Sequence, residues 1–186
     1  TLSSSSAASD VYKRQIYELS LSPESVKRFH DMKIVYSPMH GAGVRLVPES
    51  LKRFGFTNVQ LVPEQAVIDG NFPTVESPNP EERKTMSMAI DLAKKVKADL
   101  VLATDPDSDR IGVAMPDENG EYVLLNGNQT LVLLMSYQLT RWAERGELDG
   151  NEDLMHFADC LSKAGVDVFE DGYLSEDLAR LCDPAE

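Results

Sequence analysis

Between residues 33 and 125, short apolar runs alternate with stretches that repeat apolar side chains at helical spacing. The runs are rich in β-branched and aromatic residues, as strands are. Five of them are predicted strands: residues 33–37, 59–62, 100–103, 111–115 and 122–125. The last two flank a turn and predict an antiparallel hairpin, whereas helical crossovers join parallel strands. This order predicts an α/β domain with three layers, α/β/α, and a mixed sheet.

The stretches between the first three strands predict two amphipathic helices. We expect the first to end at Gly55 and to hold Pro48 in its first turn, where the missing N–H costs nothing. For the second helix, Asn79 is the expected N-cap and Pro80 the first helical residue. A further helix is expected after the hairpin, opening near Gly127.

Acidic residues are concentrated near the C-terminus. Residues 146–186 hold 12 acidic and 2 basic side chains, which account for ten of the thirteen net negative charges. This excess argues against nucleic-acid binding by that segment. Two weakly amphipathic stretches, 153–164 and 175–181, occur in it without a motif. We therefore expect four segments: a non-native or disordered leader at 1–15, a linker or helix at 16–32, the α/β domain at 33–149, and an unassigned acidic tail at 150–186.

No apolar run approaches the length that spans a membrane, so no membrane partner is expected. The two cysteines, Cys160 and Cys182, stand in no metal-binding pattern, and reduced thiols are typical of the cytosol. The sequence therefore predicts a soluble, cytoplasmic protein.

Three carboxylates follow the third predicted strand at alternate positions: Asp105, Asp107 and Asp109. In an extended loop this spacing turns all three to one side, where their mutual repulsion favours a cation. Carboxylate oxygens are hard ligands of the kind that Mg²⁺ prefers. Arg110 follows directly and offers a planar guanidinium suited to a phosphate oxygen. The loop therefore predicts a Mg²⁺ site beside a phosphate.

This aspartate loop has three other interpretations. A calcium EF-hand loop would need Gly at position 110 and Glu at position 116, where Arg110 and Pro116 stand. A haloacid-dehalogenase-type nucleophile also uses alternate aspartates, but it usually follows the first strand of the chain rather than the third. A solvated acidic turn stays open, although Pro106 and the strand before it disfavour that interpretation.

Gly41 and Gly43 lie where the first predicted strand ends and a helix opens, which offers backbone amides to an anion. A dinucleotide fingerprint would need a third glycine at position 46, which is Leu46, and no Walker lysine occurs. His40 is either a phosphate contact or, as a lone histidine, a structural residue. His40, Gly41 and Gly43 together form a candidate phosphate loop.

Four motifs occur in order within residues 33–145. They are Ser37-Pro38-Met39-His40-Gly41-Ala42-Gly43, Pro78-Asn79-Pro80-Glu81, Ala103-Thr104-Asp105-Pro106-Asp107-Ser108-Asp109-Arg110 and Asn126-Gly127-Asn128-Gln129. Together they resemble the second domain of the phosphoglucomutase/phosphomannomutase family. The glycine and asparagine loops are most similar to the phosphoglucomutase-type mutases of bacteria.

The resemblance implies one domain of a four-domain isomerase of carbohydrate metabolism. A phosphoserine on domain I would exchange a phosphoryl group with a phosphosugar, as between glucose 1-phosphate and glucose 6-phosphate. Asp105, Asp107 and Asp109 would hold Mg²⁺ with a phosphoserine oxygen, and Arg110 would position phosphate. Ser108 stands where the family usually has glycine or alanine.

The family's serine loop, sugar-reading loop and C-terminal phosphate clamp have no counterpart in this sequence. We therefore expect domains I, III and IV of a mutase as partners, and no isomerase activity from the isolated chain. The alternative is a non-enzymatic module that binds a metal or a phosphorylated ligand through the same loop. We prefer the mutase interpretation, because the alternative does not explain agreement across a whole domain.

Overall fold

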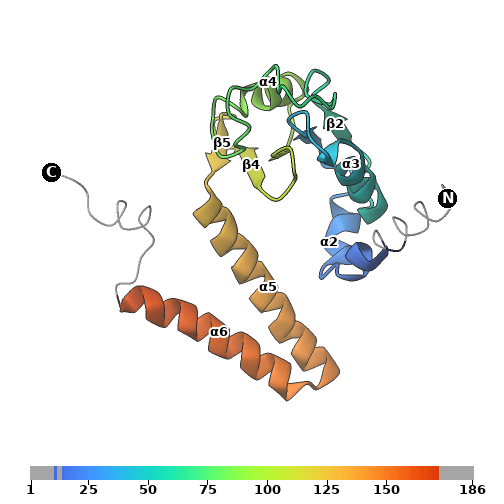
Figure 1. Cartoon of the computed structure of the whole chain (residues 1–186). Coiled ribbons are helices and arrows are strands. Elements are labelled where there is room, and N and C mark those ends of the chain that lie inside the picture. Colours follow the sequence, from blue (N-terminus) through green and yellow to red (C-terminus); the bar gives the residue numbers. More distant parts are fainter. Residues whose placement is uncertain (1–10, 12–13, 172–186) are drawn as a thin grey trace. The chain divides into compact units, whose positions relative to one another are not determined.

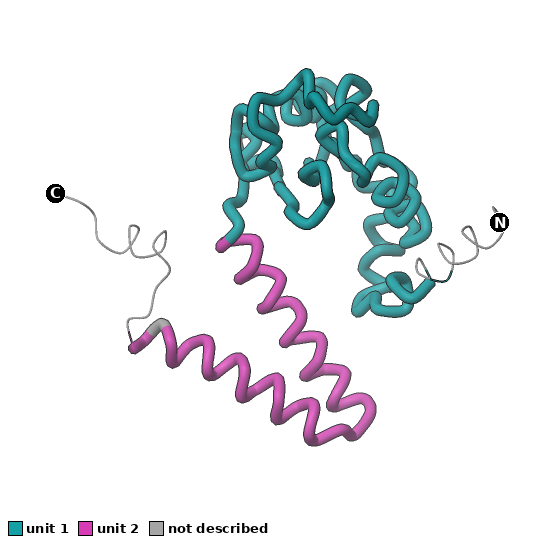
Figure 2. Tube along the Cα trace, viewed as in Figure 1, with its two compact units in different colours: residues 1–127 teal, residues 128–186 magenta. Residues whose placement is uncertain are grey.

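The computed structural model describes residue 11 and residues 14–171 of the 186-residue chain. The chain divides into two compact units, residues 1–127 (unit 1) and residues 128–186 (unit 2), as Figure 2 shows. The elements of unit 1, labelled in Figure 1, are α2 (Pro23–Arg28), β1 (Ile34–Ser37), α3 (Gly43–Phe54), β2 (Val59–Leu61), α4 (Ser87–Val96), β3 (Leu100–Thr104), β4 (Ile111–Pro116) and β5 (Tyr122–Leu125). Those of unit 2 are α5 (Gly127–Asp149), which begins at the boundary, and α6 (Glu152–Glu170).

The five strands form one sheet in the order β2-β1-β3-β4-β5. Strand β1 is parallel to both β2 and β3, whereas β4 is antiparallel to β3 and to β5. The chain moves outward from β1 to β2 through α3, then back past β1 to β3 through α4. Because such crossovers are right-handed, the two helices cover opposite faces of the sheet. The predicted α/β fold with three layers and a mixed sheet is confirmed.

Helix α3 ends as predicted, because Gly55 adopts the left-handed conformation, with φ of 116°, that glycine accepts most easily. The placement of Pro48 in the first turn was wrong, since the helix already begins at Gly43 and Pro48 lies inside it. Gly43 can occupy this first helical position because, without a Cβ, it fits closely against the Tyr36 and Thr104 hydroxyls.

Helix α4 begins at Ser87, so the predicted start at Asn79 and Pro80 was also wrong. The Asn79 side-chain oxygen instead accepts a hydrogen bond of 3.1 Å from the backbone N–H of Glu81, which closes a local turn. Asn-Pro sequences favour such turns as readily as helix starts. Residues 79–86 therefore form a connecting segment that leads into the helix.

The best-packed part of the core lies between α4 and the sheet. The buried side chains there include Ala89 and Ala93 of α4 and Val101, Ala103 and Ala114 of the sheet. Tyr122 belongs to the same core, and its hydroxyl donates to backbone carbonyl oxygens at the end of α4. This packing fixes β3, the strand that precedes the aspartate loop.

Unit 2 is a helical hairpin. Gly150, with φ of 61°, turns the chain between its helices, and the Asn151 side chain accepts a 3.0 Å hydrogen bond from the backbone N–H of Leu154 at the start of α6. The amphipathic stretch 153–164 lies in α6, whereas the stretch 175–181 lies outside the described residues. None of the described helices is both long enough and apolar enough to cross a membrane.

Candidate metal centre

Two loops meet at one edge of the sheet. Strands β1 and β3 are parallel neighbours, so their carboxyl ends lie together, and the chain continues from them into residues 38–42 and 105–110. The order of the strands reverses between β1 and β3, because β2 follows on one side and β3 on the other. Crevices at such reversal points are the usual ligand sites of open α/β sheets.

The three predicted metal ligands are brought together. One carboxylate oxygen from each of Asp105, Asp107 and Asp109 lies within 4.8 Å of the other two. Asp105 is buried, with 1% of its surface exposed, whereas the other two side chains are exposed. The cluster therefore has one fixed carboxylate at its base and two that face solvent.

The geometry of this cluster suits Mg²⁺. An octahedral Mg²⁺ ion holds its oxygens at about 2.1 Å, so adjacent ligands are about 3.0 Å apart and opposite ones about 4.2 Å apart. The three carboxylate oxygens lie within 4.8 Å of one another, and movements of the exposed Asp107 and Asp109 side chains would bring them to these separations. Three hard anionic oxygens are also the donor type that this ion prefers.

The backbone of the aspartate loop is held in a turn. The N–H of Ser108 donates to the carbonyl oxygen of Asp105 at 3.1 Å. The N–H of Asp105 donates to the carbonyl oxygen of Arg110 at 3.4 Å. Ser108 has φ of 66°, a left-handed conformation that costs a non-glycine residue about 1 kcal/mol or more. The strain is local to the turn that brings the carboxylates together.

Arg110 holds the buried carboxylate from two directions. Its backbone N–H donates to Oδ1 of Asp105 at 3.1 Å, and its Nε donates to Oδ2 at 2.8 Å. Burial alone would raise the pKa of Asp105, but the hydrogen bonds from Arg110 outweigh burial and hold this pKa below its ordinary value. Asp105 therefore stays ionised in the pH range where a metal would need it.

The exposed carboxylates repel one another. The hydrogen bond that Asp109 shares with Asp105, followed by the negative charges of Asp107 and Asp105, raises the pKa of Asp109 above its ordinary value. The nearby guanidinium of Arg110 offsets part of this repulsion. A divalent cation would relieve it more completely.

The glycine loop, defined as residues 38–43, packs directly against the aspartate loop. A Cβ on Gly41 would lie 2.3 Å from the Cα atom of Pro106, which is too close for any side chain. The next N–H, of Ala42, donates to the carbonyl oxygen of Pro106 at 2.8 Å. Gly41 is therefore required by the contact between the two loops.

Gly43 fits into a second close contact. A Cβ there would lie 2.3 Å from the hydroxyl oxygen of Tyr36 and 2.9 Å from that of Thr104. These two hydroxyls are themselves joined by a 2.8 Å hydrogen bond that links β1 to β3. Both glycines thus serve the packing beneath the carboxylate cluster.

His40, the third residue of the candidate phosphate loop, is 3% exposed. Its Nδ1 lies 2.8 Å from the carbonyl oxygen of Val67, which can only accept, so Nδ1 carries a proton. Its Nε2 lies 2.8 Å from the hydroxyl of Thr74, and that hydroxyl oxygen accepts a 3.1 Å hydrogen bond from the Gln65 side-chain amide. Both ring nitrogens therefore have partners inside the chain.

The backbone amides of the glycine loop are also engaged. The N–H of Met39 donates to the Ser37 hydroxyl, and that of His40 donates to the carbonyl oxygen of Gln65. The N–H groups of residues 41 and 42 donate to the carbonyl oxygens of Pro38 and Pro106, respectively. A phosphate contact by His40, Gly41 and Gly43 stays a prediction, and these four amides do not support it. Met39 and His40 adopt left-handed φ angles of 45° and 64°, so the hydrogen bonds hold a strained loop in place.

Several residues that shape the site were not identified from the sequence. Gln65 is fully buried and accepts a 2.6 Å hydrogen bond from the Ser37 hydroxyl, while its amide reaches Thr74. It lies in an irregular segment without a periodic pattern, so no signal marked it. Tyr36 looked like an ordinary strand residue, and Thr104 stood in the aspartate motif without a role of its own; only the hydrogen bond between their hydroxyls gives them one.

Comparison with known proteins identifies the same domain. The family model described as phosphoglucomutase/phosphomannomutase, alpha/beta/alpha domain II, matches residues 10–120. A phosphoglucomutase of Staphylococcus aureus is 40% identical over 114 residues, which cover 61% of this chain and 21% of that protein. A phosphoglucomutase of Staphylococcus haemolyticus is 44% identical over 109 residues, which cover 59% of this chain and 20% of that protein.

Among solved structures, a phosphoglucomutase/phosphomannomutase family protein from Burkholderia thailandensis is similar in fold. The TM-score is 0.56 at 26% sequence identity, and the match covers 72% of this chain and 26% of that one. Compared with the two Staphylococcus phosphoglucomutases, the match spans about a fifth of the relatives' length.

Proposed function

Because the chain belongs to the phosphoglucomutase/phosphomannomutase family, as its alpha/beta/alpha domain II, we propose that it supplies the Mg²⁺ site of a phosphosugar mutase. The observation that carries this proposal is the cluster of Asp105, Asp107 and Asp109, whose oxygens lie within 4.8 Å of one another at the carboxyl edge of the sheet. The reaction is a phosphoryl transfer between two positions of a sugar phosphate.

Each residue of the aspartate loop has a distinct part in this proposal. Asp105 is the fixed ligand, because burial and two hydrogen bonds from Arg110 leave it one orientation. Asp107 and Asp109 are exposed and adjust around the ion. Mg²⁺, when bound, neutralises charge that develops on a transferring phosphoryl group. The Arg110 side chain is 54% exposed, so its free N–H groups remain available to a phosphate oxygen.

The substrate class follows from the relatives rather than from this chain. Two relatives at 40% and 44% identity are named phosphoglucomutase, which supports interconversion of glucose 1-phosphate and glucose 6-phosphate by the whole enzyme. The phosphoserine and the sugar-binding groups would come from domains I, III and IV. We expect the chain alone to bind the metal without isomerising a sugar phosphate.

Paramagnetic mapping tests the proposed site. Mn²⁺ favours the same carboxylate oxygens as Mg²⁺, and it broadens the NMR signals of nearby amides. We expect broadening centred on residues 105–110 and on the adjoining residues 38–43, reversed by an excess of Mg²⁺. Broadening spread over the acidic residues of α6 instead would contradict the assignment.

An activity assay separates the mutase from the alternative of a non-enzymatic module. We expect no conversion of glucose 1-phosphate by the isolated chain, and conversion when the same domain is joined to the remaining mutase domains. The Asp107→Asn variant of the joined enzyme should lose most of that activity. No conversion by the joined protein would favour the non-enzymatic module, and a joined enzyme that works equally well with this substitution would contradict the role of Asp107.

A further inference from the structure

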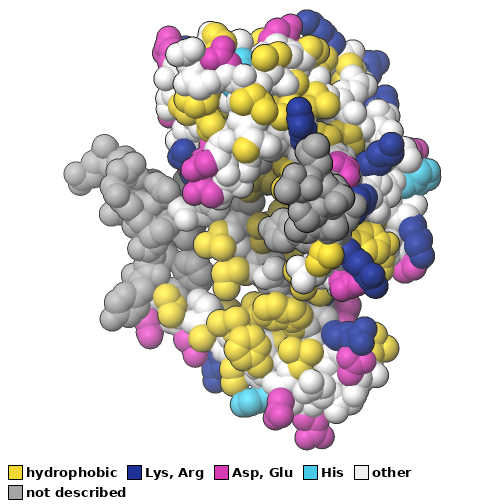
Figure 3. All heavy atoms as spheres, turned by 45° about the vertical axis from the view of Figure 1, so that its right-hand side comes forward, with side chains coloured by type: hydrophobic (Ala, Val, Ile, Leu, Met, Phe, Trp, Pro, Cys, Tyr) yellow, Lys and Arg dark blue, Asp and Glu magenta, His cyan; other side chains and the backbone are white. Residues whose placement is uncertain are grey.

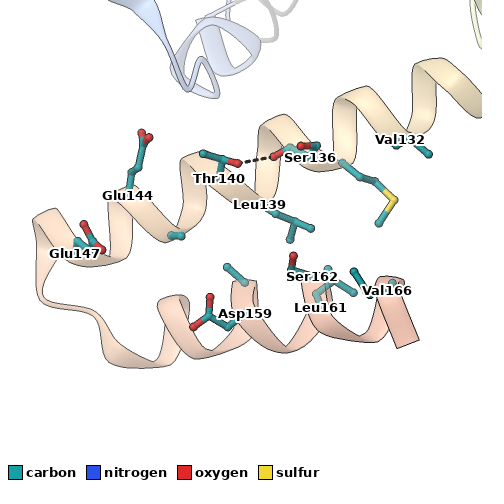
Figure 4. Close-up of a pocket in the computed structure, with 14 residues that line it drawn as sticks. Val132, Ser136, Leu139, Thr140, Glu144, Glu147, Asp159, Leu161, Ser162 and Val166 are labelled. Carbon is teal, nitrogen blue, oxygen red and sulfur yellow. Dashed lines mark hydrogen bonds between the residues drawn. The ribbon is translucent and has the colours of Figure 1, made fainter. Parts of the chain in front are cut away.

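An apolar groove lies between α5 and α6, within unit 2, and shares no residue with the candidate metal centre. Its volume is about 510 Å³, and Figure 4 shows the side chains that line it. Leu139 points from α5 toward α6, where Leu161 and Val166 lie. Within the described part of unit 2, the two helices have no third element that closes this groove.

The walls of the groove are more exposed than a core would be. Val132 on α5 is 52% exposed, and Val166 on α6 is 53% exposed. Figure 3 shows hydrophobic side chains gathered on the lower part of the view, with acidic, basic and histidine side chains at their border. Exposed apolar surface of this kind, rimmed by polar groups, marks interaction sites.

The charge of the groove has one sign. Glu144, Glu147 and Asp159 line it, and none of its lining residues is basic. They lie toward the end where the two helices are connected (Figure 4). Arg141 pairs with Glu144, whereas Glu147 and Asp159 have no ion pair in the described part of the chain. Residues 128–171 as a whole hold nine acidic and three basic side chains.

We propose that this groove binds an amphipathic helix with a basic face, whose apolar side packs on Leu139, Leu161 and Val166 and whose lysines or arginines lie beside Glu147 and Asp159. An apolar helix face in an apolar groove is a common mode of recognition, and opposite charges at the border set orientation and partner choice. A second copy of this chain fits less well, because its own acidic groove would bring like charges together. An anionic membrane surface is disfavoured for the same reason.

A model peptide tests the proposal on the whole chain. The probe is a fluorescently labelled helix of about 18 residues with leucine on one face and lysine on the other. We expect saturable binding, seen as a rise in fluorescence anisotropy, that weakens as salt concentration increases. A matched peptide with glutamate in place of lysine should not bind.

Two pairs of charge reversals locate the site. The double variant Glu147→Lys with Asp159→Lys should weaken binding about tenfold. The control, Asp167→Lys with Glu170→Lys, has the same net charge but alters residues outside the groove, so it should bind as tightly as the parent chain. Val132→Asn, an exposed position, should also weaken binding while the helical circular dichroism is unchanged.

Three results would overturn the proposal. They are equal binding of the lysine and glutamate peptides, equal loss in both charge-reversed pairs, and a dimer of this chain that Val132→Asn separates into monomers. The last would show that a second copy occupies the groove. A failure of all these tests would leave the metal centre untouched, because the two sites share no residue.

Discussion

The glycine loop and the aspartate loop lie side by side at the same edge of the sheet, yet most of their polar side chains differ in exposure and in hydrogen bonding. His40 of the glycine loop is 3% exposed and hydrogen-bonded at both ring nitrogens, whereas Asp107 and Asp109 face solvent. Both loops include residues with left-handed φ angles. The difference teaches that one loop supports the fold and the other carries the carboxylates of the proposed metal site, so variants of the two loops should fail in different ways.

The largest expected effect is on the support. Gly41→Ala should destabilise the chain by about 3 kcal/mol or more, because the new Cβ meets the Pro106 backbone, which cannot move aside easily. The measurement is urea unfolding. Gly70→Ala is the matched control, since nothing lies within 4 Å of a Cβ at that position. Equal stability of these two variants would contradict the close contact between Gly41 and the Pro106 backbone.

A smaller loss of stability is expected from the polar network beneath the glycine loop. Gln65→Ala should cost about 2 kcal/mol, because it opens a cavity and leaves the buried Ser37 hydroxyl without its acceptor. Gln60→Ala, at an exposed position of β2, should change stability by less than about 0.5 kcal/mol. If urea midpoints of the two variants coincide, Gln65 does not hold the loop.

On the aspartate loop, removing strain should have the opposite sign. Ser108→Gly should stabilise the metal-free chain by about 0.5–1 kcal/mol, because glycine adopts φ of 66° without a steric cost. Ser50→Gly in α3 is the control and should destabilise by a similar amount, since glycine weakens a helix interior. A destabilised Ser108→Gly chain would mean that the left-handed turn is not strained.

The smallest expected effect comes from charge repulsion among the aspartates. The pKa of Asp109 is raised in the folded chain, so its ionised form opposes folding and the penalty is present only above the ordinary aspartate pKa. Asp109→Asn should therefore raise the urea midpoint slightly at neutral pH without metal, and this gain should vanish in acid. Asp91→Asn, on α4, should show no such gain. A gain that persists in acid would point to packing rather than charge.

The sequence predicted the architecture because the relevant signals are local. The short apolar runs predicted the bounds of all five strands to within one residue. Helix α3 ends at Gly55 as expected, because glycine accepts the left-handed conformation there. The aspartate spacing likewise predicted three carboxylates on one side, and they lie together. Such patterns report backbone geometry directly, without knowledge of what packs nearby.

The parts that were missed depend on contacts between distant segments. The start of α3 was predicted too late, because the sequence does not show that Gly43 packs closely against the hydroxyls of Tyr36 and Thr104. The start of α4 was predicted too early, because Asn79 closes a local turn instead of capping the helix. The partners of His40 come from residues 65–74, which show no periodic pattern. The glycines looked like an anion site, and only the nearness of Pro106 reveals their role in packing.

The most direct test of the proposed metal centre is a calorimetric titration of Mg²⁺ into the chain and into its Asp107→Asn variant. We predict weak, saturable binding of Mg²⁺ at one site. The substitution should reduce the Mg²⁺ affinity about tenfold or more, because one of the three carboxylate ligands is lost. The urea midpoint of the metal-free variant should not fall, since Asp107 is exposed and supports no packing. Equal Mg²⁺ affinity of the chain and its variant, or no saturable binding by either, would contradict the account.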